Sequence, residues 1–128
     1  MWDVDLDLRP EGKQGRLAAS LTSFEGYLQR WAQTWERQAL VRGRACAGDR
    51  AVQSWWGDIV DAWVWERPFS EDEAREVRRM KARVERERIP PNEDPAFHLK
   101  LGRGSLSDVE WTVQLLQLQQ LDLSLIHI

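Results

Sequence analysis

The stretch WGDIVDAW, residues 56–63, is the clearest indicator of the fold class. Its apolar residues recur at positions i, i+3, i+4 and i+7, which is the spacing of one face of an α-helix. These residues are Trp56, Ile59, Val60 and Trp63. Pro68 ends the segment, because proline disfavours helical backbone in the residue before it. The spacing therefore predicts an amphipathic helix with one face buried in a helical core.

The segment before this stretch has the same helical spacing. From Leu21 onward, apolar residues again fall on one stripe, and a break or bend can occur near residues 33–34. The stripe consists of Phe24, Tyr27, Leu28, Trp31 and Trp35. Gly43 and Gly48 indicate that this helical region ends by Asp49.

Two further helices are predicted after Pro68. Ser70 and Glu73 have the spacing of a capping box, and the helix that follows carries a narrow apolar stripe before Pro90 stops it. That stripe is Ala74, Val77, Met80 and Val84. Ser107 and Glu110 have the same spacing and predict a second capping box at the start of a last helix. The residues that we expect this last helix to bury are Leu106, Val109, Val113 and Leu116.

Eight tryptophans in 128 residues indicate a fold with aromatic packing. Those on apolar stripes are expected in the core, and they are Trp31, Trp35, Trp56, Trp63 and Trp111. Together the patterns predict a bundle of about four or five helices over residues 21–122.

Residues 2–9 follow a different pattern. They alternate strictly between apolar and charged side chains up to Pro10, which predicts one half-buried β-strand. No second clear strand follows, and a lone strand cannot satisfy its own hydrogen-bonding edges. The expected fold class is therefore mainly α, with one strand in residues 1–20 left over from a truncated α/β domain whose sheet lies upstream.

The last six residues, 123–128, break the helical pattern before them. They read LSLIHI, which is similar to the in-frame translation of a transposon-end sequencing adapter. We therefore interpret them as an artefact and assign no function to them.

Composition narrows the classes of function. The chain has 18 basic and 21 acidic residues and a net charge of -3, whereas a protein that binds nucleic acid through phosphates is usually basic. No apolar run is long enough to span a membrane, and no secretory signal is visible. The lone Cys46 permits no internal disulfide, so the expected location is the cytoplasm, with neither nucleic acid nor membrane as a partner.

The sharpest chemical feature is the acidic face of the predicted strand. Asp3, Asp5 and Asp7 point to the same side, roughly 6.5–7 Å apart along the strand. Such carboxylates repel one another unless solvent or a cation separates them, and Mg²⁺ prefers one or two carboxylates plus phosphate oxygens. For a generic sequence a solvated face is favoured over a metal site. Arg9 lies on the same face, where phosphate contact and a simple strand-end charge are about equally expected.

Three segments, in order, resemble motifs of the bifunctional glutamine synthetase adenylyltransferase/adenylyl-removing enzymes. VDLDLRPEG at residues 4–12 is similar to V-D-x-x-L-R-P-x-G, and WAQTWERQAL at residues 31–40 is similar to W-x-x-T-W-E-x-Q-A-L. KLGRGSLSDVEW at residues 100–111 is similar to K-L-G-x-G-G-L-x-D-[IV]-E-[FW], with Ser105 where the family usually has glycine. The resemblance covers nearly all of residues 2–121.

The resemblance implies a chemistry. In the family a tyrosine hydroxyl of glutamine synthetase attacks the α-phosphate of ATP, two divalent ions (Mg²⁺ or Mn²⁺) are held by three acids, and a second half removes AMP by phosphorolysis. Asp5 matches the third of these acids, so it is the expected catalytic residue and metal ligand, with Asp7 as a second candidate ligand. A PII-type signalling protein is a further expected partner.

The resemblance also implies what this chain lacks. The family's Gly-Ser loop and paired acids lie upstream of the strand, and no such loop is present here. We therefore expect an internal fragment that is inactive on its own. It is similar to the C-terminal, adenylylating half of actinobacterial members.

The remaining candidate residues have structural alternatives. Lys100 and Arg103 precede a helix N-terminus, where phosphate contact is expected less than a structural loop. Asp108 and Glu110 are candidate acids that suit capping and the helix dipole better than catalysis. Glu36 is interpreted as structural, pairing with Arg42 or Arg44.

Two other functions stay open from the sequence. One is the helical domain of a uridylyltransferase that modifies a PII protein, against which the segment at residues 35–40 argues. The other is a non-catalytic helical interaction module whose strand only caps the bundle.

Overall fold

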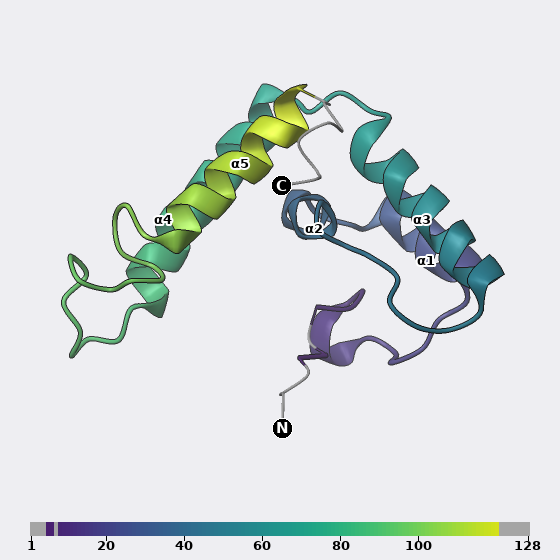
Figure 1. Cartoon of the computed structure of the whole chain (residues 1–128), viewed down its shortest axis with the longest axis horizontal. Helices are drawn as coiled ribbons and strands as arrows, with labels where there is room; N and C mark the ends of the chain where they lie inside the picture. The colour runs from purple at the N-terminus through teal and green to yellow at the C-terminus, as the bar shows by residue number, and fades with distance from the viewer. Residues whose placement is uncertain (1–4, 7, 121–128) are drawn as a thin grey trace.

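A computed structural model of the chain describes residues 5–6 and 8–120. Within those residues the chain forms five α-helices and one 3-10 turn (Figure 1). The elements are η1 (Gly12–Gln14), α1 (Leu21–Arg30), α2 (Thr34–Leu40), α3 (Arg50–Trp65), α4 (Glu71–Arg88) and α5 (Leu106–Gln120). The prediction of a mainly helical chain is confirmed. None of the helices in the described ranges is long and apolar enough to cross a membrane.

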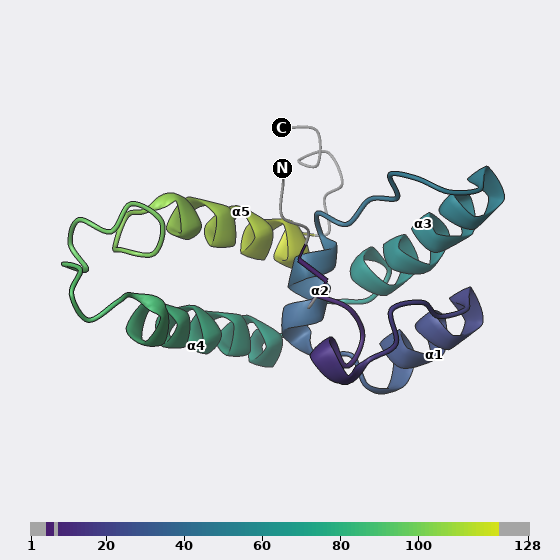
Figure 2. The same cartoon turned by 90° about the horizontal axis from the view of Figure 1, so that it is seen from below.

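The short helix α2 lies at the centre of the fold. It contacts α3 on one side and both α4 and α5 on the other, while α1 packs along α3 and α4 along α5 (Figures 1 and 2). The core lies where these pairs meet, and its buried residues are Val41, Val60, Val64, Trp65 and Leu118. The molecule therefore consists of two helical pairs that are joined through α2.

Local sequence signals set the helix boundaries. Ser70 accepts a hydrogen bond from the Glu73 backbone N–H at the start of α4, and the Glu73 carboxylate accepts one from the Ser70 N–H. The predicted capping box is confirmed, and the apolar stripe of α4 begins with two buried residues, Ala74 and Val77. The break near residues 33–34 is also confirmed, because Gln33 is the N-cap of α2.

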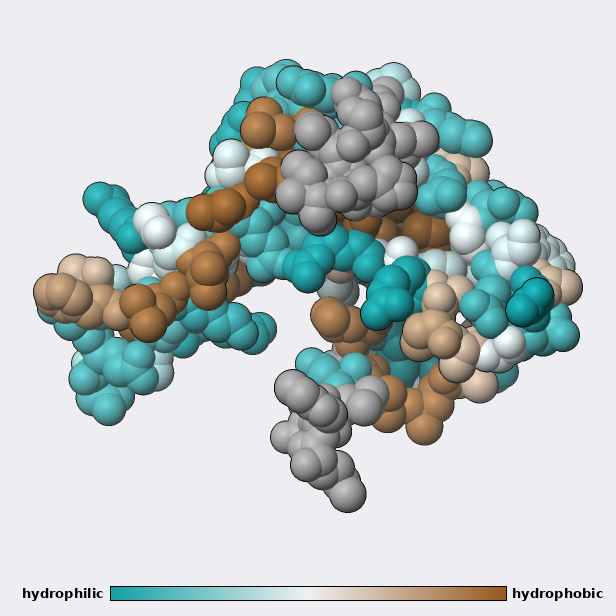
Figure 3. Space-filling view, in the orientation of Figure 1, coloured by the Kyte–Doolittle hydropathy of each residue, from teal (hydrophilic) through white to brown (hydrophobic). Residues whose placement is uncertain are grey.

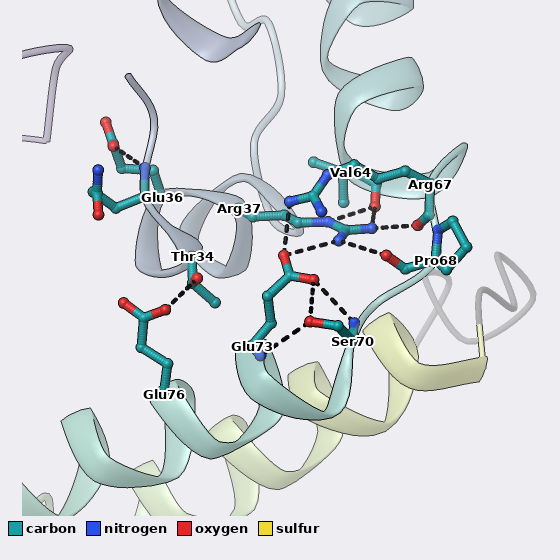
Figure 4. A network of polar contacts seen from close by, with 10 residues as sticks. Thr34, Glu36, Arg37, Val64, Arg67, Pro68, Ser70, Glu73 and Glu76 are labelled. Carbon is teal, nitrogen blue, oxygen red and sulfur yellow. Dashed lines mark hydrogen bonds and ion pairs between the residues drawn. The ribbon is translucent and has the colours of Figure 1, made fainter. Parts of the chain in front are cut away.

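A buried arginine ties α2 to the connection between α3 and α4. The Arg37 side chain is fully buried, and its guanidinium donates hydrogen bonds to the carbonyls of Val64, Arg67 and Pro68 (Figure 4). The closest of these N···O distances, to Val64 and Arg67, are both 2.7 Å. The same guanidinium forms an ion pair with Glu73, at 3.3 Å.

The chemistry of a helix end explains these contacts. The last carbonyls of a helix have no partner within the helix, and burying them without a donor is costly. Arg37 supplies donors to Val64, in the last turn of α3, and to Arg67 and Pro68 in the connection that follows the helix. Burial and the nearby Arg67 lower the pKa of Arg37, and Glu73 acts in the opposite direction. The guanidinium nonetheless stays charged, because arginine is not deprotonated in proteins.

The predicted N-terminal strand is wrong for the residues that the structure describes. Residues 5 and 6 belong to no strand, and residues 8–11 form a bend and a turn. The alternating pattern suits a strand, but a strand needs a neighbour to accept and donate its backbone hydrogen bonds. No other strand lies in residues 5–6 and 8–120. Asp3, and the rest of residues 1–4 with Asp7, lie outside the described residues.

The predicted buried face of α5 is also wrong. Leu106, Val109, Val113 and Leu116 are 74%, 63%, 40% and 45% exposed. The helix instead packs against α2 and α4 through its opposite side. The second capping box is not formed either, because Ser107 lies inside α5 and its buried hydroxyl contacts that of Ser105.

The tryptophans divide between the core and the surface. Trp35, Trp56, Trp63 and Trp111 are partly buried, as the apolar stripes predict. Trp31 is 69% exposed, so its predicted place in the core is wrong, because α1 ends at Arg30, one residue before it. Trp65, at the last position of α3, is buried instead.

We expect Arg37→Met to lower the free energy of unfolding by about 3 kcal/mol, because it leaves one buried and two partly buried carbonyls without their donor and removes the partner of Glu73. Urea denaturation followed by circular dichroism measures this change. The matched control is Arg75→Met, because Arg75 pairs with Asp72 on the exposed side of α4. It should cost less than about 0.5 kcal/mol. Equal losses for the two variants would contradict the role assigned to Arg37.

Candidate functional site

The first candidate site is the turn that follows Asp5. Asp5 is exposed, and the Arg9 guanidinium curls back onto its own loop. Arg9 donates hydrogen bonds to the carbonyls of Leu6, Lys13 and Gly15, the last two at 3.0 Å. The predicted phosphate ligand is therefore seen holding the turn closed. Its contacts join the segment beside Asp5 to the loop that ends at Gly15.

The backbone of this turn requires glycine at one position and is unusual at another. A Cβ atom on Gly15 would lie 1.9 Å from the Pro10 carbonyl oxygen, so only glycine fits there. Glu11 has φ 62° and ψ 11°, in the left-handed region that costs a non-glycine residue roughly 1–2 kcal/mol. Other contacts must therefore hold Glu11 in this conformation.

The turn is docked on the first two helices by a hydrogen-bonded relay. The Glu11 N–H donates to the Tyr27 hydroxyl at 3.4 Å, and that hydroxyl donates to Glu36 at 2.8 Å. The other oxygen of Glu36 accepts from the Gln33 N–H at 2.8 Å. Burial and the hydrogen bond to Glu36 raise the pKa of Tyr27, so the phenol stays protonated at neutral pH. The proposed pairing of Glu36 with Arg42 or Arg44 is not what the structure shows.

Apolar contacts complete the docking. Leu8 and Pro10 line a small cavity of about 140 Å³ together with side chains of α1 and α2. The helical residues in this lining are Phe24, Tyr27, Leu28, Trp35, Glu36, Ala39 and Leu40. The motif at residues 4–12 and the motif at residues 31–40 are thus in contact in the fold. Helix α2 thereby fixes the course of the chain after Asp5.

The ligands that the fold family implies for a metal are only partly available here. No group of three His, Cys, Asp or Glu side chains that could hold a metal ion occurs in residues 5–6 and 8–120. Asp5 offers one carboxylate, and Asp7 lies outside the described residues. A divalent ion needs more oxygen ligands than this. The described part of the chain therefore offers one candidate ligand and not the full set of ligands that such a site needs.

The second candidate site is the loop between α4 and α5. The Lys100 and Arg103 side chains are exposed, and Arg103 lies on the rim of an open cavity of about 860 Å³ at the end of α4. The Lys100 carbonyl accepts hydrogen bonds from the Ser105 hydroxyl and the Ser107 N–H, at 2.7 and 3.2 Å. A Cβ on Gly102 would lie 2.4 Å from the Pro95 carbonyl oxygen. The backbone of this loop is thus tightly folded, while its two basic side chains extend into solvent.

The serine in place of glycine is accommodated without strain. Among the described residues the only positive φ outside glycine is that of Glu11, so Ser105 has ordinary backbone geometry. Its hydroxyl contributes to the loop by bonding the Lys100 carbonyl.

Asp108 and Glu110 have structural partners. Asp108 accepts hydrogen bonds from the Lys81 ammonium and from the Gly104 N–H, and so fixes the start of α5 against α4. Glu110 forms an ion pair with Arg42. The contacts of Asp108 are those of a residue that fixes a helix start, whereas Glu110 pairs with a residue that follows α2 and does not cap α5.

The structure does not bring the two candidate sites together. Residues 8–15 pack beside α1 and α2, whereas the 89–105 loop lies at the far end of the α4–α5 pair (Figures 1 and 2). Arg9 therefore lies away from Lys100 and Arg103. The amino-acid pattern places Tyr27 on an apolar stripe and does not predict the hydrogen bonds of its hydroxyl. Its being the one tyrosine of the chain is a weak signal that could have drawn attention to it.

We expect the stabilising effect of Asp108 to be lost in acid. The hydrogen bonds from Lys81 and Gly104 lower its pKa below the ordinary value of 3.8. A carboxyl with a lowered pKa stabilises the folded state above its pKa in the unfolded chain, and this effect disappears as the pH falls through its folded pKa. Asp108→Asn should therefore cost about 1 kcal/mol at neutral pH.

The difference between the original chain and Asp108→Asn should shrink as the pH falls below about 4. Unfolding in urea across a pH series measures it. Asp61→Asn, on the exposed side of α3, is the control and should leave stability nearly unchanged at every pH. A difference for Asp108→Asn that stays constant down to acid pH would contradict the ion pair.

Comparison with known proteins identifies the family that the chain resembles. A family model described as glutamate-ammonia ligase adenylyltransferase matches residues 1–56. Three relatives share the name bifunctional glutamine synthetase adenylyltransferase/adenylyl-removing enzyme. The chain is 51% identical over 117 residues to that of Streptomyces avermitilis, 53% over 117 to that of Leifsonia xyli subsp. xyli and 50% over 118 to that of Mycobacterium tuberculosis.

Each of these alignments covers 91% of the chain and 12% of the relative. The alignments cover nearly the whole chain, and the family model covers both the Asp5 turn and the α2 segment. The chain spans about an eighth of the length of the relatives that it matches, and it belongs to the family of bifunctional glutamine synthetase adenylyltransferases/adenylyl-removing enzymes.

Proposed function

We propose that this chain is the part of a glutamine synthetase adenylyltransferase in which the catalytic domain meets the helical domain. The observation that carries the proposal is the relay from Glu11 through Tyr27 to Glu36. It joins the turn beside the candidate metal ligand to the helical body. Sequence identity to named adenylyltransferases runs through both parts.

In this proposal Asp5 supplies one carboxylate to a Mg²⁺ or Mn²⁺ site. A bound ion would neutralise charge on ATP when a tyrosine hydroxyl of glutamine synthetase attacks the α-phosphate and pyrophosphate leaves. The remaining ligands belong to segments that this chain does not contain. The role of the described residues is to hold the backbone beside Asp5 in place. The hydrogen bonds of Arg9 to its own loop do this, together with the packing of Leu8 and Pro10 against α1 and α2.

The assignment to adenylyl transfer is supported over the two alternatives. The three relatives compared above all carry the adenylyltransferase name, which disfavours uridylyl transfer. The family model match begins at residue 1 and includes Asp5, which disfavours a module made of helices alone. Removal of AMP by phosphorolysis, a PII-type partner and an origin in the C-terminal half remain predictions from the resemblance.

The proposal is tested by grafting the chain into an intact relative. The 117 matching residues of the Streptomyces avermitilis enzyme are replaced by those of this chain, and transfer of labelled AMP to glutamine synthetase is measured. We expect the graft to be active and Asp5→Asn in it to lower transfer at least ~100-fold, because a metal ligand is lost. The isolated 128-residue chain should show no transfer.

Asp58→Asn is the matched control, because Asp58 is an exposed aspartate on α3 and far along the chain from the turn. It should retain normal transfer. Normal turnover of the Asp5→Asn graft would refute the metal assignment, and AMP transfer by the isolated chain would refute the need for further ligands.

A further inference from the structure

Helix α5 carries apolar residues on both of its sides, and only one of these sides is covered in this fold. The side that packs against α2 and α4 includes Ser107, Gln114 and Gln117, all at most 9% exposed, with Leu118 fully buried and with Trp111 and Leu115 partly buried beside α4. The opposite side carries Leu106, Val109, Val113 and Leu116, at spacings of three and four residues. A helix at the surface of a globular protein normally carries polar and charged residues on its outer side. We call these four residues the outer α5 face.

The outer α5 face is part of a larger apolar surface. The preceding loop adds Phe97 and Leu99, which are 81% and 84% exposed. Figure 3 shows hydrophobic surface that follows the course of α5 and continues onto this loop. Single exposed apolar residues are common, but a contiguous apolar surface of this kind marks an interaction site.

The rotation of α5 is fixed, so the helix cannot turn this face inward. The Gln38 amide donates a hydrogen bond to Gln114 at 2.8 Å in the buried contact between α2 and α5. Lys81 holds Asp108 near the start of the helix. A rotation that buried the outer α5 face would break both contacts. The buried side-chain amides of Gln38 and Gln114 would then lose the hydrogen bond that joins them. The face must therefore be covered by something outside the described fold.

The chemistry of the face favours a permanent apolar contact. Residues 111–120 contain no charged side chain, so this half of the helix offers nothing to attract a charged partner. Helix α4 beside it is rich in both arginine and glutamate. Interfaces that assemble and dissociate are about as polar as ordinary surface, whereas permanent ones are more apolar.

The size of the relatives indicates where such a contact comes from. The alignments cover only 12% of each relative, so most of a polypeptide of that length lies outside this chain. A segment of the same polypeptide is held at a high effective concentration and needs no separate encounter. We infer that in a polypeptide of this length the outer α5 face packs against the apolar side of a further helix of the same polypeptide.

This inference does not depend on AMP transfer, and its test measures accessibility alone. Val113→Cys is made in a Cys46→Ser background, both in the isolated chain and in the graft described above. The rate of maleimide labelling at position 113 is then followed by mass spectrometry of its proteolytic peptide. Asp72→Cys is the control, because the Asp72 side chain is 90% exposed and lies on α4.

We expect the ratio of the two labelling rates, position 113 to position 72, to be at least ~10-fold lower in the graft than in the dilute isolated chain. Photochemical footprinting of the unsubstituted proteins with a diazirine probe gives the same comparison without a mutation. There, Val109, Val113 and Leu116 should be modified in the isolated chain and protected in the graft.

Three outcomes would overturn the inference. The first is equal labelling of position 113 in the graft and in the isolated chain. The second is protection that rises with the concentration of the isolated chain, which would identify a second copy as the occupant. The third is protection in the graft only after glutamine synthetase is added, which would identify the partner enzyme.

Discussion

The buried guanidinium of Arg37 is the interaction on which the arrangement of the helices depends. A fully buried charge is tolerated only when its hydrogen bonds are satisfied and a counter-charge is near. Arg37 meets both conditions, with three backbone carbonyls and the Glu73 carboxylate around it (Figure 4). Those partners lie at the end of α3, in the connection and in α4. One side chain of α2 therefore sets how the two helical pairs meet.

The neighbour of Arg37 in the sequence connects α2 to the N-terminal turn. Glu36 accepts hydrogen bonds from the Tyr27 hydroxyl and the Gln33 backbone, whereas Arg37 donates to the connection between α3 and α4. Adjacent positions on a helix point in different directions, so two consecutive residues can serve two different contacts. Through this pair, the short α2 links the segment that carries Asp5 to the helical body.

The two candidate regions differ in how their polar groups are used. In the N-terminal turn Arg9 closes its own loop, and in the 89–105 loop the Lys100 carbonyl organises the serines that follow it. Asp108 secures the start of α5. Among the predicted site residues, Asp5, Lys100 and Arg103 have exposed side chains. Local polar contacts in both regions therefore build the scaffold, and these three candidate side chains face outward.

The sequence by itself determined the helices and some of their ends, because periodicity, caps and prolines act over a few residues. The Ser70 capping box and the break before Thr34 are of this kind. Only the tertiary structure decided which faces are buried. It placed Arg37 inside, left Trp31 outside and turned one apolar side of α5 to the surface, because burial depends on what else is present to pack against. The residues near Asp5 show the same limit: their alternation suits a strand, yet a strand forms only where a neighbouring strand completes its hydrogen bonds.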